Sequence, residues 1–211
     1  MLGAVALSID KTVKNLLFLD ICGTVTKENT TLGFLRTIGI RASMTERIIG
    51  SILWRYFSYD YLRPKLLKRL AGKNQAELLS LSNNYVASLD YINEVIEIID
   101  DYKLKGYKLV IISATIDTIA NAIAKKFDAV LCYSSVLEYR DGTCTGRLSH
   151  DLLDNKLSYI KHLFQHNTAI ITDNYGDYEI VAHCAEALGI AHCKNDEVFW
   201  GKNKVNFIRV K

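Results

Sequence analysis

The chain has 211 residues, of which 49% are hydrophobic and 23% are charged, and it contains a single proline. This composition is typical of one compact globular domain, or of a core domain with a modest insertion, and it excludes a disordered chain. The formal net charge of +3 is too small to indicate nucleic-acid binding.

The cysteines and the apolar runs indicate the cellular compartment of the protein. Five cysteines without a CxxC pair fit reduced thiols better than a disulfide framework. The first ten residues lack the basic start of a signal peptide, and no charge-free apolar run approaches the roughly 18 residues of a membrane span. We therefore expect a soluble, cytoplasmic protein, and we leave its oligomeric state open.

Short apolar runs alternate with segments of helical periodicity along the chain. The predicted strands are Leu16–Leu19, Leu109–Ile112, Ala129–Cys132, Ala169–Thr172 and Ile190–Cys193. The predicted helices are Ile92–Lys105, Asp117–Lys126, Asn155–Gln165 and Asp177–Ala187. This alternation predicts an α/β fold with a doubly wound parallel sheet, covered by helices on both faces.

A long helical segment interrupts this alternation. The first two predicted strands are separated by about 90 residues, whereas a simple crossover needs roughly 10–15. Within the gap, Asn74 followed by Glu77 has the pattern of a helix N-cap. We expect a small helical cap at 28–91 over one end of the sheet, and an α/β core formed by 1–27 and 92–211.

A β-hairpin is predicted later in the chain, at Leu137–Leu148. Arg140-Asp141-Gly142 supplies turn chemistry between two strand-like flanks.

Three of the predicted strands run directly into a polar residue. Asp20, Ser113 and Asp173 follow the first, second and fourth predicted strands. Taken singly, each is equally typical of a helix N-cap or a loop. Because ligands bind outside the carboxyl ends of strands in open α/β sheets, the three together predict one shared cleft.

At these positions the sequence resembles a known family. Asp20-Ile-Cys-Gly-Thr24 resembles the first motif of the haloacid dehalogenase-like (HAD) hydrolases, commonly DxDGT after an apolar strand. Ser113 resembles the second motif, Lys156 the third, and the acidic pair Asp173 and Asp177 the fourth. The motifs stand in the family's order over essentially the whole chain. The helical insertion and the hairpin are similar to those of phosphoserine phosphatase-like members.

The resemblance implies phosphoryl-transfer chemistry. Asp20 would attack phosphorus and form an aspartyl-phosphate, which divides the displacement into two easier steps. Mg²⁺ would be held by Asp20, Asp173 and the backbone carbonyl of Cys22, because hard cations prefer oxygen ligands. Lys156 would neutralise the carboxylates and the phosphate.

The remaining motif residues would support this centre. Ser113 would donate a hydrogen bond to a phosphate oxygen, Thr24 would help to bind the substrate, and Asp177 would hold Lys156 or a metal-bound water. Two alternatives are open at this stage. Lys156 could instead be a solvated lysine at a helix start, and Asp177 could be an acid of a first helical turn, favoured by the helix dipole.

Cys22 departs from the family pattern, in which an Asp at this position serves as general acid and base. A thiol with an ordinary pKa near 8.5 is a poor match to that cycle. The substrate could carry a good leaving group or its own proton donor, a cap residue could replace the acid, or the phospho-enzyme could transfer its phosphoryl group to another acceptor. The site could also resemble relatives that cleave carbon–phosphorus bonds, or bind phosphate without turnover. As a purely structural residue, Cys22 would be a small side chain in a tight turn.

The predicted cap combines basic and aromatic residues. Residues 51–73 contain six Lys or Arg against one acid, interleaved with five aromatic residues. Such a segment could attract an anionic substrate or rest on an anionic membrane surface. We favour an amphipathic helix pair whose aromatic side chains pack on the core. Asn29 stands where phosphoserine phosphatases carry a substrate-binding Glu, which argues against phosphoserine as the substrate.

Taken together, the sequence predicts a Mg²⁺-dependent phosphohydrolase acting on a small phosphorylated metabolite. The alternatives are a phosphotransferase or lipid-linked phosphatase that uses the basic aromatic cap, and a non-catalytic phosphate-ligand-binding protein that has lost its general acid. The expected partner is the small phosphorylated substrate, and no nucleic acid.

Overall fold

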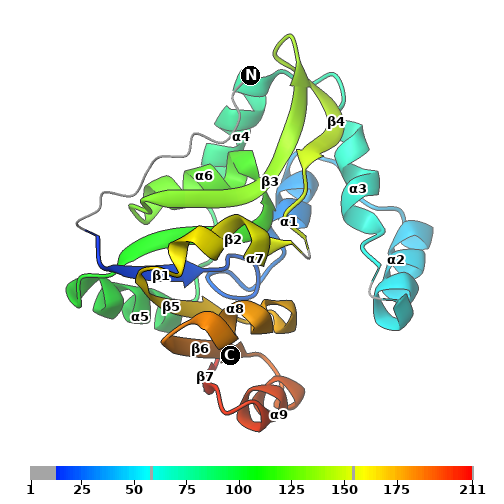
Figure 1. Cartoon of the computed structure of the whole chain (residues 1–211). Helices are drawn as coiled ribbons and strands as arrows, with labels where there is room; N and C mark the ends of the chain where they lie inside the picture. Colours follow the sequence, from blue (N-terminus) through cyan, green and yellow to red (C-terminus); the bar gives the residue numbers. More distant parts are fainter. Residues whose placement is uncertain (1–12, 58, 154, 211) are drawn as a thin grey trace.

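The computed structural model describes residues 13–57, 59–153 and 155–210. A seven-stranded sheet in the order β4-β3-β2-β1-β5-β6-β7 lies at its centre (Figure 1). Neighbouring strands pair in parallel, except β3 and β4, which form the predicted antiparallel hairpin. The strands are β1 (Asn15–Leu19), β2 (Lys108–Ile116), β3 (Leu131–Arg140), β4 (Thr143–His150), β5 (Asn167–Thr172), β6 (Glu186–Ala191) and β7 (Asn206–Arg209). The predicted α/β fold is confirmed.

The central strands β1, β2 and β5 are buried on both faces. Leu17 and Leu19 of β1 point into one apolar cluster, and Leu16 and Phe18 point into another, as the two-residue period of a strand requires. The first cluster is covered by α5 (Asn93–Leu104) and α6 (Asp117–Lys126), and the second by α7 (Lys156–Ile160), α8 (Tyr178–His183) and α9 (Lys194–Lys202). This double cover explains why the central strands read as unbroken apolar runs.

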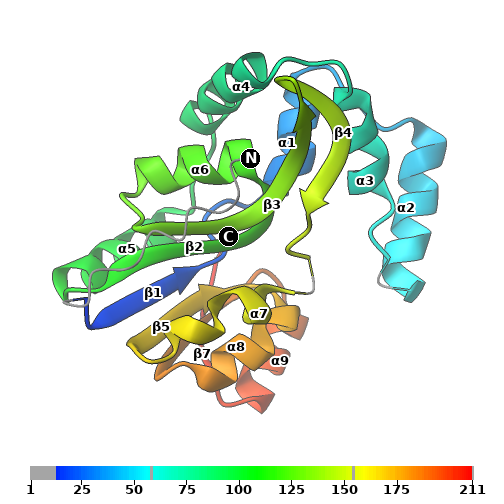
Figure 2. The same cartoon turned by 45° about the horizontal axis from the view of Figure 1, so that its top comes forward.

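Helices occupy most of the segment between β1 and β2. They are α1 (Thr30–Thr37), α2 (Met44–Phe57), α3 (Leu62–Leu67), the short 3₁₀ helix η1 (Lys68–Leu70) and α4 (Gln75–Ala87), followed by α5 of the core. Asn74 caps α4 as predicted, because its side chain accepts a hydrogen bond from the N–H of Ala76. α2 and α3 stand at the edge of the molecule, on the side to which the β1 arrow points (Figures 1 and 2). The division into a core and a cap at 28–91 stays a prediction.

Several predicted boundaries differ from the structure. The predicted helix Asp177–Ala187 is wrong at its end, because α8 stops at His183 and Glu186 already pairs with β5. The strand expected at Ile190–Cys193 is β6, which begins and ends earlier. Backbone pairing with a neighbouring strand here overrides local periodicity. The strand expected to begin at Ala129 is β3 and begins at Leu131.

Two further elements, α9 and β7, were not predicted. The first ten residues, which were interpreted above as lacking a signal peptide, lie outside the described residues. Within the described part, no helix is both long and apolar enough to cross a bilayer.

Candidate active site

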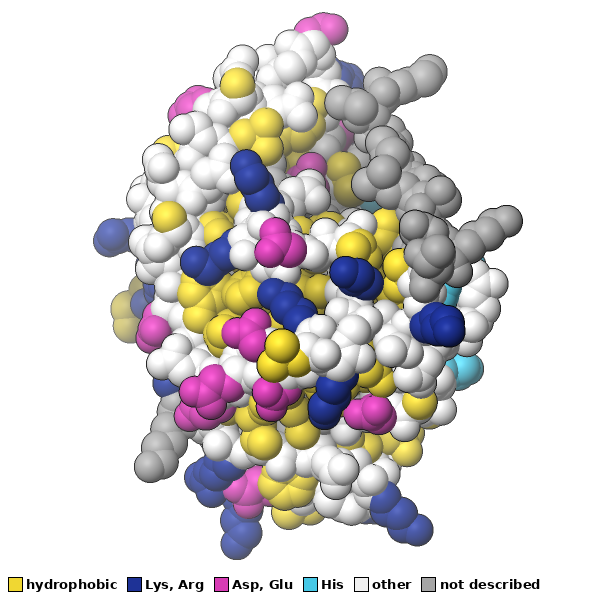
Figure 3. Space-filling model, turned by 90° about the vertical axis from the view of Figure 1, so that its left-hand side faces the viewer, with side chains coloured by type: hydrophobic (Ala, Val, Ile, Leu, Met, Phe, Trp, Pro, Cys, Tyr) yellow, Lys and Arg dark blue, Asp and Glu magenta, His cyan; other side chains and the backbone are white. Residues whose placement is uncertain are grey.

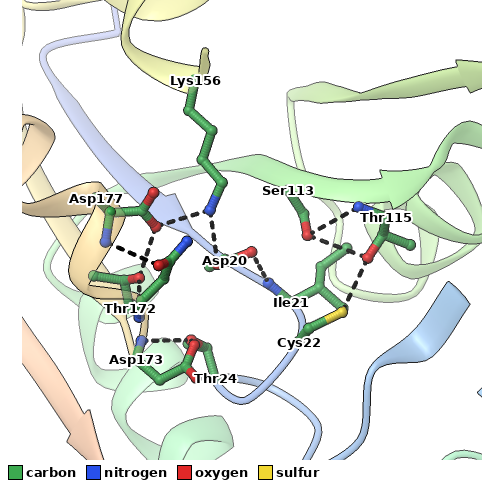
Figure 4. Close-up of polar contacts among 12 residues, drawn as sticks. Asp20, Ile21, Cys22, Thr24, Ser113, Thr115, Lys156, Thr172, Asp173 and Asp177 are labelled. Atoms are coloured by element: carbon green, nitrogen blue, oxygen red, sulfur yellow. Dashed lines mark hydrogen bonds and ion pairs between the residues drawn. The ribbon is translucent and has the colours of Figure 1, made fainter. Parts of the chain in front are cut away.

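Lys156 lies between two carboxylates at the carboxyl ends of the central strands (Figure 4). Its Nζ donates to Oδ2 of Asp20 at 2.7 Å and to Oδ2 of Asp177 at 2.8 Å. All three side chains are buried, with 7%, 7% and 3% of the side-chain surface exposed. The alternative of a solvated lysine is therefore wrong. Burial opposes the charged ammonium, but Asp20 and Asp177 outweigh it and raise the pKa of Lys156.

Asp177 is fixed at the same time by the end of β5. Its Oδ2 also accepts a hydrogen bond from Oγ1 of Thr172 at 2.7 Å. Although Asp177 precedes α8, its side chain makes no capping hydrogen bond to that helix. The structure thus places Asp177 as the partner of Lys156, while its backbone lies in the first turn of the short 3₁₀ helix at Tyr175–Asp177.

Asp173 follows β5 and is held over the loop that follows β1. Oγ1 of Thr24 donates to its Oδ1 at 3.0 Å and accepts its backbone N–H at 2.9 Å. Gly23 has a φ of +73°, and a Cβ there would lie 2.0 Å from Oδ2 of Asp173. Only glycine therefore permits this close approach. Pairing of β1 with β5 continues to Asp20, whose N–H bonds to Ile171, and this brings the two acidic residues together.

The described part of the site holds more negative than positive charge. Burial, and next the charge of Asp20, raise the pKa of Asp173 to about 7. Burial also raises the pKa of Asp177, although Lys156 opposes this. The nearest basic group to Asp173 is the imidazole of His192, whose Nε2 lies 4.0 Å from Oδ2.

This charge imbalance fits a divalent cation beside Asp20 and Asp173. Mg²⁺ typically takes one or two carboxylates together with phosphate oxygens and waters. Across the described ranges, no group of three or more His, Cys, Asp or Glu side chains is placed to hold a metal ion. The donor set thus suits a cation that is completed by substrate and water better than a closed protein cage.

Cys22 points away from the carboxylates into a group of hydroxyls (Figure 4). Its Sγ accepts the N–H of Thr30 at 3.3 Å and lies 3.2 Å from Oγ1 of Thr30 and 3.3 Å from Oγ1 of Thr115. Burial, and next the charge of Asp20, raise the pKa of the thiol. Cys22 is therefore a protonated thiol at neutral pH.

Ser113 joins the same hydroxyl group, where its Oγ lies 3.2 Å from Oγ1 of Thr115. Ser113 was predicted to follow the strand, but it lies within β2. The pairing of β2 with β3 is irregular between Ser113 and Ile116. Such an irregularity re-aims a side chain at the strand end. Thr115 and Thr30 were missed, because no motif singles them out.

Asn29 has a structural role in the described chain. Its Oδ1 accepts the N–H of Leu32 at 3.0 Å and caps α1. No contact joins Asn29 to the carboxylates, so its assignment to substrate binding stays a prediction. Neighbouring Glu28 accepts hydrogen bonds from Tyr85 and Arg36, both at 2.7 Å.

Arg63 is the second feature that sequence reasoning missed. It is 5% exposed and joins α3 to the core next to the site. It donates to the carbonyl of Ala114 at 2.9 Å, to Asp60 at 2.7 Å and to Asp151 at 2.6 Å. Asp60 is a local partner three residues away, but Ala114 and Asp151 come from distant segments, so no local pattern could have shown that Arg63 joins α3 to the core.

His192 is a third such residue. Its Nε2 donates to the carbonyl of Gly23 at 2.6 Å, which ties the segment after β6 to the loop after β1. The sequence interpretation assigned no role to this histidine.

The predicted packing of the cap aromatics is wrong. Trp54, Tyr56, Phe57 and Tyr59 are 60%, 70%, 72% and 56% exposed, and they do not pack on the core. The helix α2 packs against the rest of the protein through Glu46 and Gly50, which are its only buried residues, so its aromatic side chains stay exposed.

Comparison with known proteins supplies the family. The model of the haloacid dehalogenase-like hydrolases matches residues 17–181. No curated protein sequence matches this chain.

The structure is similar to several solved structures. A protein of unknown function from Bordetella pertussis Tohama I shares 15% identity at a TM-score of 0.73, over 93% of this chain and 99% of that one. A phospho-aspartyl intermediate analogue of phosphoserine phosphatase shares 17% identity at a TM-score of 0.66, over 92% of both chains. Phosphoserine phosphatase from T. onnurineus shares 18% identity at a TM-score of 0.60, over 97% of this chain and 93% of that one.

At these identities the likeness shows a common fold. The family match covers most of the chain and includes residues 20–24, Lys156, Asp173 and Asp177. The chain belongs to the haloacid dehalogenase-like hydrolase family.

Proposed function

We propose that this protein is a Mg²⁺-dependent phosphohydrolase that acts on a small phosphorylated metabolite through an aspartyl-phosphate on Asp20. The observation that carries the proposal is the buried cluster in which Lys156 bridges Asp20 and Asp177 beside Asp173. Family membership and the fold shared with phosphoserine phosphatases support the same chemistry.

In this proposal each residue has a definite task. The ammonium of Lys156 pairs with the Asp20 carboxylate and offsets the charge of the incoming phosphate. Oδ1 of Asp20 already accepts the N–H of Ile21 at 2.7 Å, which orients the carboxylate. An oxygen of Asp20 forms the new bond to phosphorus while the bond to the leaving oxygen breaks. Mg²⁺, held by Asp20, Asp173 and the Cys22 carbonyl, would withdraw charge from the phosphate oxygens.

Ser113 and Thr115 are suited to hold the transferred phosphoryl group. Both residues are buried, and the hydroxyl of Thr115 contacts Sγ of Cys22 in the loop at residues 20–24. Ser113 would donate to a phosphate oxygen, and Thr115 would orient Ser113.

Cys22 limits which substrates react well. A protonated thiol with a raised pKa is a weak acid for an alkoxide leaving group, which costs roughly 10²–10⁴-fold where such help is needed. We therefore expect substrates with good leaving groups, or with a proton donor of their own. Slow hydrolysis of the phospho-enzyme would favour the alternative function, transfer of the phosphoryl group to another acceptor.

The first test is the replacement Asp20→Asn. It removes the nucleophile with little change of shape, so hydrolysis of p-nitrophenyl phosphate with Mg²⁺ should fall to background. Asp100→Asn, at an exposed position of α5, is the matched control and should keep wild-type turnover. Turnover that persists in purified Asp20→Asn protein would rule out the assigned nucleophile.

A further inference from the structure

The outer face of α2 carries an apolar stripe that nothing in the described chain covers. Met44, Ile48, Ile52 and Tyr56 recur every four residues, so they lie on one side of the helix. Their exposed fractions are 79%, 51%, 49% and 70%. A helix of a soluble protein normally turns such a stripe towards the core.

The inner face of α2 is attached without these residues. Gly50 lets the helix approach α3 closely, because a Cβ there would lie 2.6 Å from Cγ of Leu62. Glu46 binds Arg69 at 2.7 Å and Lys65 at 3.4 Å. The fold therefore holds α2 by a glycine contact and an ion-pair cluster, and it leaves the apolar stripe free.

The exposed charges of α2 have a single sign. Arg47 and Arg55 are exposed, whereas the one acidic residue of the helix, Glu46, is 8% exposed and already paired. Arg41 adds a third exposed cation just before the helix. By contrast, the side of the molecule seen in Figure 3 carries basic and acidic side chains next to one another.

Aromatic residues complete the surface at the end of α2. Trp54, Phe57 and the following Tyr59 are 60%, 72% and 56% exposed. Amphipathic aromatic rings are typical of the boundary between membrane and water. An exposed apolar stripe on a helix that also exposes arginines and aromatic residues is the pattern of a helix that lies in a lipid interface.

A second copy of the chain fits this surface less well. Symmetric pairing of α2 with its copy would bring Arg47 and Arg55 of both helices together without an exposed carboxylate of either helix to neutralise them. Anionic lipid headgroups supply that charge, and the acyl layer takes up the stripe.

We propose that α2, together with Tyr59, docks on the surface of an anionic phospholipid bilayer. The helix lies in the plane of the interface, with Met44, Ile48, Ile52 and Tyr56 towards the acyl chains and Arg47 and Arg55 among the headgroups. Because α2 stands on the side to which β1 points (Figure 1), docking places the carboxyl ends of the strands on the membrane side of the molecule.

The two tryptophans of the chain give a local readout of this contact. Trp200 is fully buried, whereas Trp54 lies exposed on α2. Vesicles of phosphatidylcholine with 30 mol% phosphatidylglycerol, taken as about one third anionic lipid, should shift the emission of Trp54 to the blue and sediment the protein. Trp54→Phe should remove the shift and keep most of the sedimentation. A shift of the same size in Trp54→Phe would overturn the assignment to α2.

Paired variants test the stripe and the charges. Ile48→Asp with Ile52→Asp should weaken the vesicle partition coefficient at least about tenfold, and Arg47→Gln with Arg55→Gln should weaken it about fivefold for each arginine. Leu104→Asp, at an 87% exposed position of α5, is the control and should bind as wild type.

Three results would overturn the proposal: no binding of the wild-type protein to the anionic vesicles, an equal loss with Leu104→Asp, or a dimer in solution that the Ile48→Asp, Ile52→Asp variant dissociates. Hydrolysis of soluble p-nitrophenyl phosphate by the α2 variants should stay at the wild-type rate. Failure of the membrane proposal is therefore distinguishable from failure of the proposed activity.

Discussion

Gly23 shows how one residue sets the geometry of the loop at residues 20–24. Its backbone has a left-handed φ, and a Cβ at this position would collide with the carboxylate of Asp173. The carbonyl of Gly23 also accepts a hydrogen bond from the imidazole of His192. Gly106 has a similar φ of +83° but nothing within 4 Å of its would-be Cβ. An added Cβ would strain the backbone at both glycines, but it would collide with a neighbouring side chain only at Gly23.

We predict that Gly23→Ala impairs both stability and turnover. Backbone strain alone should cost about 1 kcal/mol at either glycine, so Gly106→Ala should lose that amount and keep its activity. Gly23→Ala should lose more stability, because the side chain of Asp173 must move. Its turnover should also fall, since a displacement of about 1 Å at such a site can cost 10²-fold in rate. Urea unfolding and phosphatase assays measure both effects. Equal behaviour of the two variants would contradict the role given to Gly23.

Cys22→Asp is the second prediction at this scale. Three groups that can donate hydrogen bonds already surround Sγ, namely the N–H and hydroxyl of Thr30 and the hydroxyl of Thr115, so a carboxylate is accommodated there. Turnover should be preserved with p-nitrophenyl phosphate and raised up to about 10²-fold with alkyl phosphates, which need an acid. Cys22→Asn, of similar size without an acid, is the control. A loss of activity on both substrates with Cys22→Asp would show that the thiol itself is required.

The site residues differ in how far the sequence reveals them. Asp20 and Asp173 could be predicted from physics, because each follows an apolar strand and ligands gather at strand ends. Lys156 was assigned by family resemblance, since its contacts span distant segments. Thr115 and Arg63 could not be predicted, because each also binds residues that are distant in sequence, and these meet only in the folded chain.

At the scale of elements, α2 and α3 show what hydrophobic periodicity leaves undetermined. The spacing of apolar residues in α2 indicates an amphipathic helix but not which side faces the protein. Here a small glycine and an ion-paired Glu46 decide the packing face, and the apolar stripe turns outward. The boundaries of α8 and β6 were missed for a related reason, because pairing with β5 decides them.

Arg63 is expected to be the main polar link between α3 and the core. Arg63→Met leaves the carbonyl of Ala114 and the partly exposed carboxylates of Asp60 and Asp151 without their buried partner, which should cost about 2 kcal/mol of unfolding free energy. Arg209→Met removes the exposed pair with Glu197, and should cost less than about 1 kcal/mol. Denaturant unfolding of both variants checks the difference. Equal losses would show that the Arg63 contacts contribute no more than a surface ion pair.

At the scale of the whole molecule, the excess of carboxylates at the strand ends opposes folding, and the proposed Mg²⁺ would offset this repulsion. We predict that Mg²⁺ raises the melting temperature of the wild-type protein. At a Mg²⁺ concentration of 100 times its Kd, the free energy of unfolding should rise by about 2.7 kcal/mol. Asp173→Asn should be more stable than wild type without metal, because a carboxylate no longer faces Asp20, and should gain little from Mg²⁺. Asp100→Asn is again the control. Chelation of Mg²⁺ should abolish turnover. A wild-type melting temperature that does not change when Mg²⁺ is added would contradict the proposed site.

The two ends of the helical segment between β1 and β2 meet beside the loop at residues 20–24. Thr26 forms an antiparallel bridge with Tyr91, and the N–H of Ile92 bonds to the carbonyl of Val25 at 2.9 Å. The chain thus leaves and re-enters the sheet layer at nearly the same point, so a turn of a few residues could join the ends directly. Segments of very different length can be exchanged at this junction without altering the strand order, which makes it a natural place for recognition to diverge while the carboxylate cluster stays the same.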